Sequence, residues 1–390
     1  MLLTDGVYPH VIGGMQKHSY YLAKHLSGNG IHVELIHCVY NEDPTGKDEK
    51  LKEFFTHREL QFLNFKCYRF PLKGKFPGHY LLENRIYSGQ VYKDYESKIL
   101  NKEYSFIYIQ GFCGHRILIE KKKKGISTPL LVNLHGFEMY QKAPNLKLRL
   151  QYSYLRREAK KQLLWADVVF SFGGEITDII TNMIKVNPHK IIKSYNGIDN
   201  SWLNASKDIK PGEGLRKFVF VGRYERRKGV EELTMVLKEL LRENHKFEFH
   251  FIGPIPALAQ IQHLQVVYHG QINNQEQLKA IVEQCDVLVC PSHSEGMPTV
   301  ILEAMACGLA VIATNVGAVE CMVDQNNGKC IERNNQQQLK IALIEVMQMK
   351  GKQLCDLKSN SIEKVKNNFL WNQIVEQLLK DLGKLSRDMV

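Results

Sequence analysis

The sequence lacks the signatures of several common classes of protein. None of its nine cysteines forms a C-x-x-C pair or combines with histidine at zinc-ligand spacing, so no structural zinc site is indicated. The patterns G-x-G-x-x-G and D-x-D are also absent, which removes the dinucleotide fingerprint and a common metal-binding motif. The longest apolar stretch, Ala304–Ala313, is interrupted by Gly308. That stretch is far shorter than the ~20 residues of a membrane-spanning helix.

The composition is ordinary for a soluble protein except for an excess of positive charge. A length of 390 residues predicts two domains, and a hydrophobic content of 44% is enough for two cores. The odd number of cysteines and the lack of a basic, then apolar, N-terminal leader predict free thiols and a cytoplasmic location. The net charge of +11 fits phosphate-bearing or other anionic partners, although solubility alone would explain it as well.

Short apolar runs alternate with helical patterns along most of the chain, which predicts parallel sheets covered by helices. The expected strands are Val33–Val39, Phe106–Gln110, Leu130–Leu134, Val168–Ser171, Phe218–Val221, Phe247–Ile252, Val266–His269, Val287–Cys290 and Ala310–Thr314. The expected helices are Met15–Gly28, Leu146–Trp165, Val230–Arg242, Gln275–Gln284, Pro298–Cys307 and Asn372–Leu385. The predicted fold class is therefore α/β, with two doubly wound, Rossmann-like domains.

A polar, glycine-bearing stretch at 205–216 predicts a linker between these domains. The first domain is then expected at 1–204 and the second at 217–368, with a final helical segment at 369–390. Because open parallel sheets bind ligands at the carboxyl ends of their strands, we expect a ligand crevice where the two sheets face each other.

The strongest motif follows the expected strand Val287–Cys290. Glu295 and Glu303 stand eight residues apart, with Gly296 and Pro298 between them. Proline suits the start of a helix, and a helix N-terminus offers free N–H groups and partial positive charge to a phosphate. The two carboxylates could then bind hydroxyl groups on either side of that phosphate, as the ribose and hexose of a nucleotide sugar would require. The alternative is two solvated glutamates on a helix surface.

A second motif follows the expected strand Phe218–Val221. After Gly222, the side chains of Arg223 and Lys228 emerge at the carboxyl edge of the sheet. An arginine fork and a lysine point charge could together neutralise a diphosphate as its bond to a sugar breaks. The alternative is a solvated basic loop, which is the expectation for Arg226 and Arg227.

Signals in the first domain are weaker. Gly13 and Gly14 stand before the first long helix, where the backbone could approach a phosphate or a sugar. His135 follows a strand and precedes a glycine, so it is a candidate to face the sugar, with a structural histidine as the alternative. The turn Asn196–Asp199 is expected only to close the first domain.

Together these residues resemble the family-4 retaining glycosyltransferases of the GT-B fold. The resemblance covers nearly the whole chain and is strongest from Phe218 to about Glu332, where G-R-x4-K-G, F-I-G and E-G-x-P-x4-E-A-M-A-C-G follow in order. The resemblance implies two facing Rossmann-like domains with a cleft between them, and a final helix that crosses back to the first domain. It implies a transferase that moves a sugar from a nucleotide-diphosphate sugar, UDP- or GDP-linked, with no cofactor and no metal.

The resemblance also assigns roles by position. Arg223 and Lys228 would hold the diphosphate, Glu303 the ribose, and Glu295 the hydroxyl groups of the donor sugar. Backbone groups near sugar and phosphate would come from Gly222, Gly296, Met297, Pro298, Thr299 and Val300. Gly14 and His135 would face the donor from the first domain, and the base would lie near Gly253 and Ile272. The family mechanism is front-face attack in which the leaving phosphate takes the acceptor's proton, so no side-chain base is nominated.

The acceptor is expected to be a glycan, a lipid-linked sugar or a small molecule, in the synthesis of cell-surface polysaccharide or glycoconjugates. Basic and apolar residues mix along Gln141–Arg157, and Lys121–Lys124 add positive charge. This pattern predicts peripheral contact with the anionic inner face of the plasma membrane, with a solvated charged face as the alternative. Nucleic acid is not expected, because the Lys and Arg are not interleaved with a stacking platform.

Two rival interpretations remain open at this point. A nucleotide-sugar 2-epimerase would have the same two-domain shape, but it does not obviously need the set Arg223, Lys228, Glu295 and Glu303. A non-catalytic two-domain sugar-binding module would need no seat for a diphosphate. Slow hydrolysis of a nucleotide sugar by the pure protein would separate an enzyme from a binding module.

Overall fold

The computed structural model describes residues 1–40, 42–72, 78–141, 146–203 and 214–388. The chain divides into two compact units, one of Met1–Tyr195 with Trp371–Val390 and the other of Asn196–Leu370. The sequence predicted that the two domains end at residues 204 and 368, whereas the boundaries between the two units follow Tyr195 and Leu370. Most of the expected linker, 205–213, lies outside the described residues.

The first unit contains a seven-stranded, wholly parallel sheet in the order β3-β2-β1-β4-β5-β6-β7. Its strands are β1 (Leu2–Leu3), β2 (Val33–Val39), β3 (Leu63–Arg69), β4 (Ile107–Gln110), β5 (Leu130–Asn133), β6 (Val168–Ser171) and β7 (Ile191–Lys193). The central strands are buried along their whole length, as expected when helices cover both faces of a parallel sheet.

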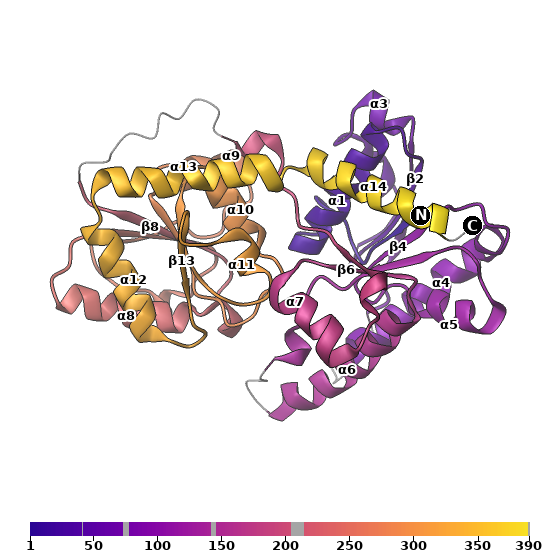
Figure 1. The fold of residues 1–390 in the computed structure, drawn as a ribbon, viewed down its shortest axis with the longest axis horizontal. Helices are drawn as coiled ribbons and strands as arrows, with labels where there is room; N and C mark the ends of the chain where they lie inside the picture. The colour runs from indigo at the N-terminus through magenta and orange to yellow at the C-terminus, as the bar shows by residue number, and fades with distance from the viewer. Residues whose placement is uncertain (41, 73–77, 142–145, 204–213, 389–390) are drawn as a thin grey trace. The chain divides into compact units, whose positions relative to one another are not determined.

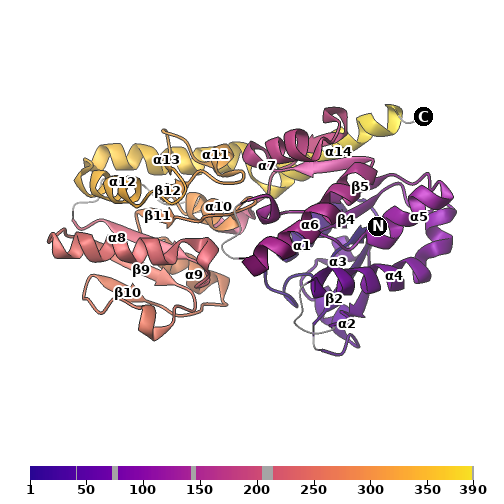
Figure 2. The ribbon, with the colours of Figure 1, turned by 90° about the horizontal axis from the view of Figure 1, so that it is seen from below.

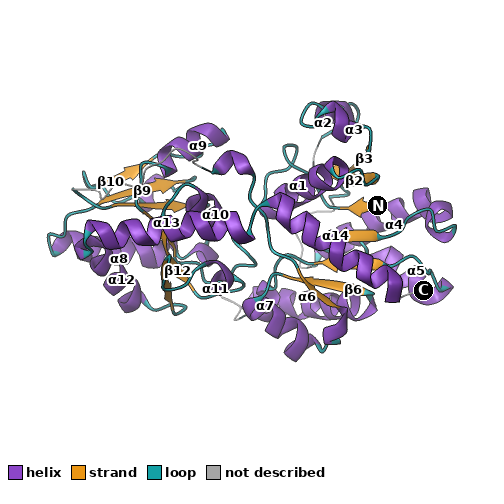
Figure 3. Cartoon of the chain, turned by 45° about the horizontal axis from the view of Figure 1, so that its top comes forward, coloured by secondary structure: helices purple, strands orange, loops and turns teal. Residues whose placement is uncertain are grey.

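Helices flank this sheet on both faces (Figure 3). They are α1 (Gly14–Gly28), α2 (Lys47–Lys52), α3 (His57–Leu60), α4 (His79–Leu100), α5 (His115–Lys124), α6 (Leu146–Trp165), α7 (Gly174–Asp178) and α14 (Trp371–Asp388). Helix α4 packs beside α5 (Figure 2), and α14 packs against α1. The Trp371 ring lies 5.0 Å from the ring of His18 and 5.8 Å from that of Tyr21, so α14 completes the core around α1.

The second unit contains a six-stranded parallel sheet in the order β10-β9-β8-β11-β12-β13. Its strands are β8 (Lys217–Val221), β9 (Glu248–Ile252), β10 (Val266–Tyr268), β11 (Val287–Cys290), β12 (Ala310–Thr314) and β13 (Gly328–Ile331). Its helices are α8 (Val230–Arg242), α9 (Gln275–Val282), α10 (Thr299–Ala306), α11 (Val319–Met322), α12 (Gln336–Gln348) and α13 (Gly351–Asn368). The pair α8 and α12 and the pair α10 and α13 enclose the sheet (Figure 1).

Both sheets have the doubly wound topology expected from the sequence. The strand order reverses between β1 and β4 in the first unit and between β8 and β11 in the second. Ligands of such sheets bind where the loops leave the carboxyl ends of the strands at this reversal. No helix in the described part of the chain combines the length and apolar character needed to cross a membrane.

Candidate functional site

The loops that leave β8, β9 and β11 pack backbone against backbone at the carboxyl edge of the second sheet. Gly229 has a φ of +68°, and a Cβ there would lie 2.0 Å from the carbonyl oxygen of Pro291. Gly253 has a φ of +142°, and a Cβ there would lie 1.9 Å from the carbonyl oxygen of Gly222. Any side chain at either position would push these loops apart, so the two glycines fix the relative position of the loops.

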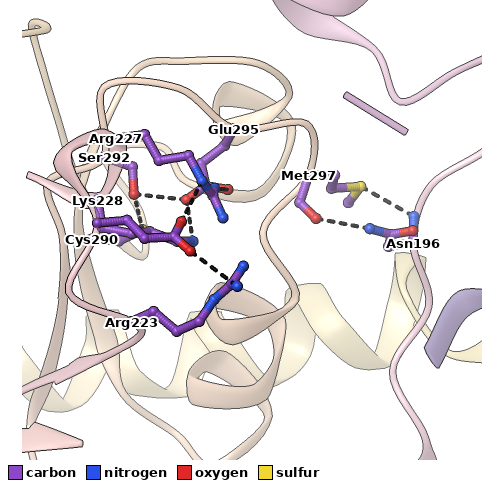
Figure 4. Close-up of polar contacts among 9 residues, drawn as sticks. Asn196, Arg223, Arg227, Lys228, Cys290, Ser292, Glu295 and Met297 are labelled. Carbon is purple, nitrogen blue, oxygen red and sulfur yellow. Dashed lines mark hydrogen bonds and ion pairs between the residues drawn. The ribbon is translucent and has the colours of Figure 1, made fainter. Parts of the chain in front are cut away.

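Glu295 is the centre of a charged cluster on this edge (Figure 4). Its carboxylate is buried, and its Oε1 accepts hydrogen bonds from Lys228 Nζ at 2.6 Å and from Ser292 Oγ at 2.7 Å. A guanidinium nitrogen of Arg227 lies 3.6 Å from Oε2. The expectation that Arg227 belongs to a solvated loop is therefore wrong, because its side chain is only partly exposed and pairs with two carboxylates, those of Glu225 and Glu295.

Arg223 lies beside this cluster and leaves most of its side chain open to solvent. Its guanidinium pairs with Glu225 Oε1 at 3.0 Å, and 69% of the side chain is exposed. The neighbouring Arg226 pairs instead with Glu231 and Glu232. The structure thus brings Arg223 and Lys228 to one edge, with the first cation exposed and the second already held by Glu295.

Helix α10 begins immediately after the loop that carries Glu295. Pro298 has an extended ψ of 114° and stands one position before the helix, so its expected place inside the first turn is wrong. Thr299 and Val300 form the first turn, where no side chain caps the helix. Glu303 lies further along α10 and is buried, eight residues after Glu295.

Asn196 is a contributor that the sequence did not reveal. Its side-chain amide donates to the carbonyl oxygen of Met297 at 2.8 Å, and its backbone N–H lies 3.1 Å from the Met297 sulfur (Figure 4). Asn196 belongs to the second unit, so the expectation that its turn only closes the first domain is wrong. The contact fixes the segment Gly296–Pro298 at the start of α10.

The positions expected near a nucleotide base follow the two outer strands on this side of the sheet. Gly253 follows β9, and its N–H donates to the carbonyl oxygen of Gly270 at 2.8 Å. Ile272 is two residues beyond Gly270 and is partly buried. The N–H of Gly222 donates a hydrogen bond to the carbonyl oxygen of Ile252 at 2.9 Å.

Two expected residues belong to the first unit. Gly14 begins α1, and a Cβ there would meet nothing within 4 Å. His135 follows β5 with a φ of +63°, and its Nε2 shares a hydrogen bond with Gln110 Oε1. Burial, and then the nearby His18, lower the pKa of His135 well below its ordinary value, so the ring is neutral at pH 7.

One cluster among the described residues could hold a metal ion. Ligand atoms of His37, Asp48 and Cys67 lie within 4.8 Å of one another in the first unit. His37 and Cys67 are register partners on β2 and β3, and His37 Nε2 lies 3.0 Å from Asp48 Oδ1. The cluster involves none of the residues expected to bind a nucleotide sugar.

Two doubly wound units, with cations and a helix N-terminus at the carboxyl edge of the second sheet, are the architecture of the GT-B fold. The family model for "Glycosyltransferase Family 4" matches residues 12–202, and that for "Glycosyl transferases group 1" matches residues 204–364. The chain therefore belongs to the family-4 glycosyltransferases, as its motifs predicted.

Similar proteins agree with this assignment. An uncharacterized glycosyltransferase of Methanocaldococcus jannaschii is 25% identical over 395 residues, which span 99% of this chain and 98% of that protein. Sucrose-phosphate synthase of Thermosynechococcus elongatus has a similar structure, with a TM-score of 0.76, 19% identity and coverage of 100% of this chain and 98% of that chain. Anabaena Alr3699/HepE, solved in complex with UDP and glucose, has a TM-score of 0.68 at 15% identity, covering 98% of this chain and 100% of that chain. The structural likenesses establish the GT-B fold.

Proposed function

We propose that the protein is a retaining, metal-independent glycosyltransferase that uses a UDP- or GDP-linked sugar as donor. The proposal rests on the ion pair between Lys228 and Glu295. This pair lies where the strand order of the second sheet reverses, beside the N-terminus of α10. The complex of the structurally similar HepE with UDP and glucose supports a donor of this chemical class.

The proposed roles follow from the charge of each group. The diphosphate binds the exposed guanidinium of Arg223 and the ammonium of Lys228, while the first turn of α10 directs its N–H groups at a phosphate. Glu303 accepts hydrogen bonds from the ribose, and Glu295 accepts them from hydroxyl groups of the donor sugar. Two cations and a helix N-terminus then neutralise the leaving diphosphate without a divalent metal.

The proposed reaction exchanges one bond at the anomeric carbon. The bond from that carbon to the diphosphate oxygen breaks, and a bond to an acceptor hydroxyl oxygen forms on the same face of the sugar. The acceptor's proton passes to the departing diphosphate oxygen, so the reaction needs no side-chain base. Arg223 and Lys228 stabilise the negative charge that develops on the leaving group, a typical source of rate enhancement. The acceptor is proposed to be a glycan, a lipid-linked sugar or a small molecule with a free hydroxyl group.

We also propose that α6 rests on an anionic membrane surface. Leu146, Leu150 and Tyr154 follow one another at intervals of four residues, and each is at least 60% exposed. Arg149 and Arg157 are exposed on the same helix. An exposed apolar stripe flanked by cations fits the boundary between anionic headgroups and acyl chains.

Vesicle sedimentation at low salt tests the membrane contact. The protein should pellet with vesicles that contain phosphatidylglycerol and stay in solution with phosphatidylcholine alone. Leu150→Glu should abolish pelleting, whereas Leu258→Glu, at a fully exposed leucine in the second unit, should leave it unchanged. Equal pelleting of the parent protein and Leu150→Glu would show that α6 is only a solvated face.

A thermal-shift panel of nucleotide sugars tests the enzymatic proposal. A ligand that binds only the native state raises the melting temperature, so one donor should stand out from the rest. Slow release of the free sugar from that donor, with its anomeric configuration kept, should follow. Binding without any sugar release would favour a sugar-binding module, and conversion of the donor to its C2 epimer would favour an epimerase.

A further inference from the structure

We propose that Ser292 and Arg227 are positioning residues that hold the Glu295 carboxylate in place, directed at the donor sugar, when Lys228 turns to the diphosphate. This inference rests on the proposed function and assigns roles to two residues that the motifs did not single out.

The ammonium group of Lys228 has two anionic partners in the proposed function, the carboxylate of Glu295 and the diphosphate. It donates to Glu295 Oε1 at 2.6 Å, and both side chains are largely buried, at 14% and 7% exposed. A diphosphate carries more negative charge than a carboxylate and therefore draws the ammonium away. Glu295 then loses its shortest ionic contact while it stays buried. A buried carboxylate without partners is costly, so it moves toward water unless other groups hold it.

Ser292 supplies a contact that does not depend on Lys228. It is fully buried two residues after β11, and its Oγ donates to Glu295 Oε1 at 2.7 Å. The only other contact of this hydroxyl group described in the structure is with Cys290 Sγ at 3.6 Å, a distance typical of a weak contact. The serine therefore has one strong acceptor, the oxygen that Lys228 would release.

Arg227 supplies the positive charge that remains near Glu295 when Lys228 turns away. Its guanidinium lies 3.6 Å from Glu295 Oε2, and its Nε donates to Glu225 Oε2 at 2.8 Å. The carbonyl oxygen of Arg227 accepts a hydrogen bond from the N–H of His293 at 2.7 Å, which ties its backbone to the loop that carries Glu295. Arg227 therefore remains beside Glu295 whichever way Lys228 turns.

The cluster forms a chain of alternating charge (Figure 4). Arg223 pairs with Glu225, Glu225 with Arg227, Arg227 with Glu295, and Glu295 with Lys228. Three cations and two carboxylates leave one net positive charge, and the two cations proposed to bind the diphosphate stand at the ends. Without Arg227 the chain would be neutral, and Glu295 would have no cation once Lys228 had turned away.

Paired binding measurements test this assignment, because Glu295 is proposed to contact the sugar and not the diphosphate. Calorimetry with UDP and UDP-glucose, and with GDP and GDP-mannose, first identifies the pair that the parent protein binds. Ser292→Ala and Arg227→Gln should then weaken binding of that nucleotide sugar by about tenfold, the typical effect of losing a hydrogen bond to a charged group. Binding of the matching nucleoside diphosphate should weaken less, because this ligand has no sugar for Glu295 to contact. Ser292→Thr, which keeps the hydroxyl group, should retain most of the parent protein's affinity for the nucleotide sugar.

Matched controls are available in the same loops. Ser294→Ala removes a hydroxyl group two residues away, and Arg226→Gln removes a cation that pairs with Glu232 instead of Glu295. Both should leave the two affinities unchanged. Retained binding of the nucleoside diphosphate shows that each variant is folded, and Arg227→Gln carries the test if Ser292→Ala does not fold.

Each outcome has a distinct meaning. Equal weakening of both ligands, or no weakening of either, would overturn the positioning roles while leaving the proposed function in place. A parent protein that binds none of the four ligands would overturn the proposed function, and with it the inference.

Discussion

The ion pair between Lys228 and Glu295 makes a prediction that needs no ligand. We consider Lys228→Met, which keeps most of the side-chain length and removes only the charge. Glu295 would then be a buried carboxylate whose remaining partners are Ser292 and, at 3.6 Å, Arg227. Removing one partner of a buried pair typically costs about 3–5 kcal/mol of stability. Because Arg227 and Ser292 remain, we expect a smaller loss, about 2–3 kcal/mol.

The second substitution, Glu295→Gln, should reverse much of this loss. In the double variant no buried carboxylate is left without its cation. Its loss in the free energy of unfolding should therefore be smaller, by at least about 1 kcal/mol, than the sum of the losses in the two single variants. In thermal denaturation followed by circular dichroism, Lys228→Met should lower the melting temperature of the second unit by about 5–10 °C. The loss should persist at high salt, since buried pairs are weakly screened.

An exposed pair provides the control. Lys380 and Glu376 lie 2.8 Å apart on α14 with side chains 61% and 67% exposed, so Lys380→Met should change stability by less than about 1 kcal/mol. If the effects of Lys228→Met and Glu295→Gln simply add within about 0.5 kcal/mol, the two groups do not interact as the structure indicates, and the reasoning about this cluster is refuted.

Three further predictions concern single residues. Glu303→Ala should weaken nucleoside diphosphate binding by roughly 1–3 kcal/mol in calorimetry, and an unchanged affinity would contradict its role at the ribose. Arg223→Glu should abolish that binding and leave the melting temperature unaltered, because its side chain is mostly exposed; a variant that still binds would exclude Arg223 from the diphosphate site. Burial raises the pKa of Glu158, but contacts with His115, Gln162 and Arg85 outweigh it and lower the pKa from 4.5 to about 2. Ionised Glu158 therefore stabilises the fold above about pH 4.5, and this contribution is lost as the pH falls toward 2. In urea unfolding, Glu158→Gln should lower the free energy of unfolding by at most about 3 kcal/mol at pH 7. The difference between the variant and the parent protein should shrink between pH 4.5 and pH 2. A stability loss in Glu158→Gln that does not vary with pH would contradict this role of the Glu158 carboxylate.

Most of the strands that the sequence revealed are largely buried, and β10, which buries only Val266, is an exception. In β11 and β12 every residue is buried, so each appears as a continuous apolar run. The strand β3 was missed because it buries only Leu63 and Cys67 and carries polar residues between them. Helix α4 was missed for a related reason, since it buries Glu83 and Asn84 among its apolar residues and so disturbs the helical pattern.

At the candidate site the sequence indicated Glu295 and the two ends of the charged chain, but not the contacts of Glu225 and Arg227 between them. Arg223, Lys228 and Glu295 could be predicted because each follows a recognisable strand at the carboxyl edge. The contacts of Ser292, Arg227 and Asn196 could not, since they depend on the path of the loops. That path is fixed where Gly229 meets the Pro291 carbonyl, and a loop carries no periodicity from which such a contact can be read.

The first unit is built from both ends of the chain, with α14 covering α1 through Trp371. A ribosome makes α1 early and α14 last, after every residue of the second unit has been translated. Until then the apolar side chains that Trp371, Val375 and Leu378 cover must stay exposed, although domains usually fold in the order in which they are synthesised. A chain that stops before Trp371 therefore retains a whole second unit and an unfinished first one, whose uncovered face is a site for aggregation.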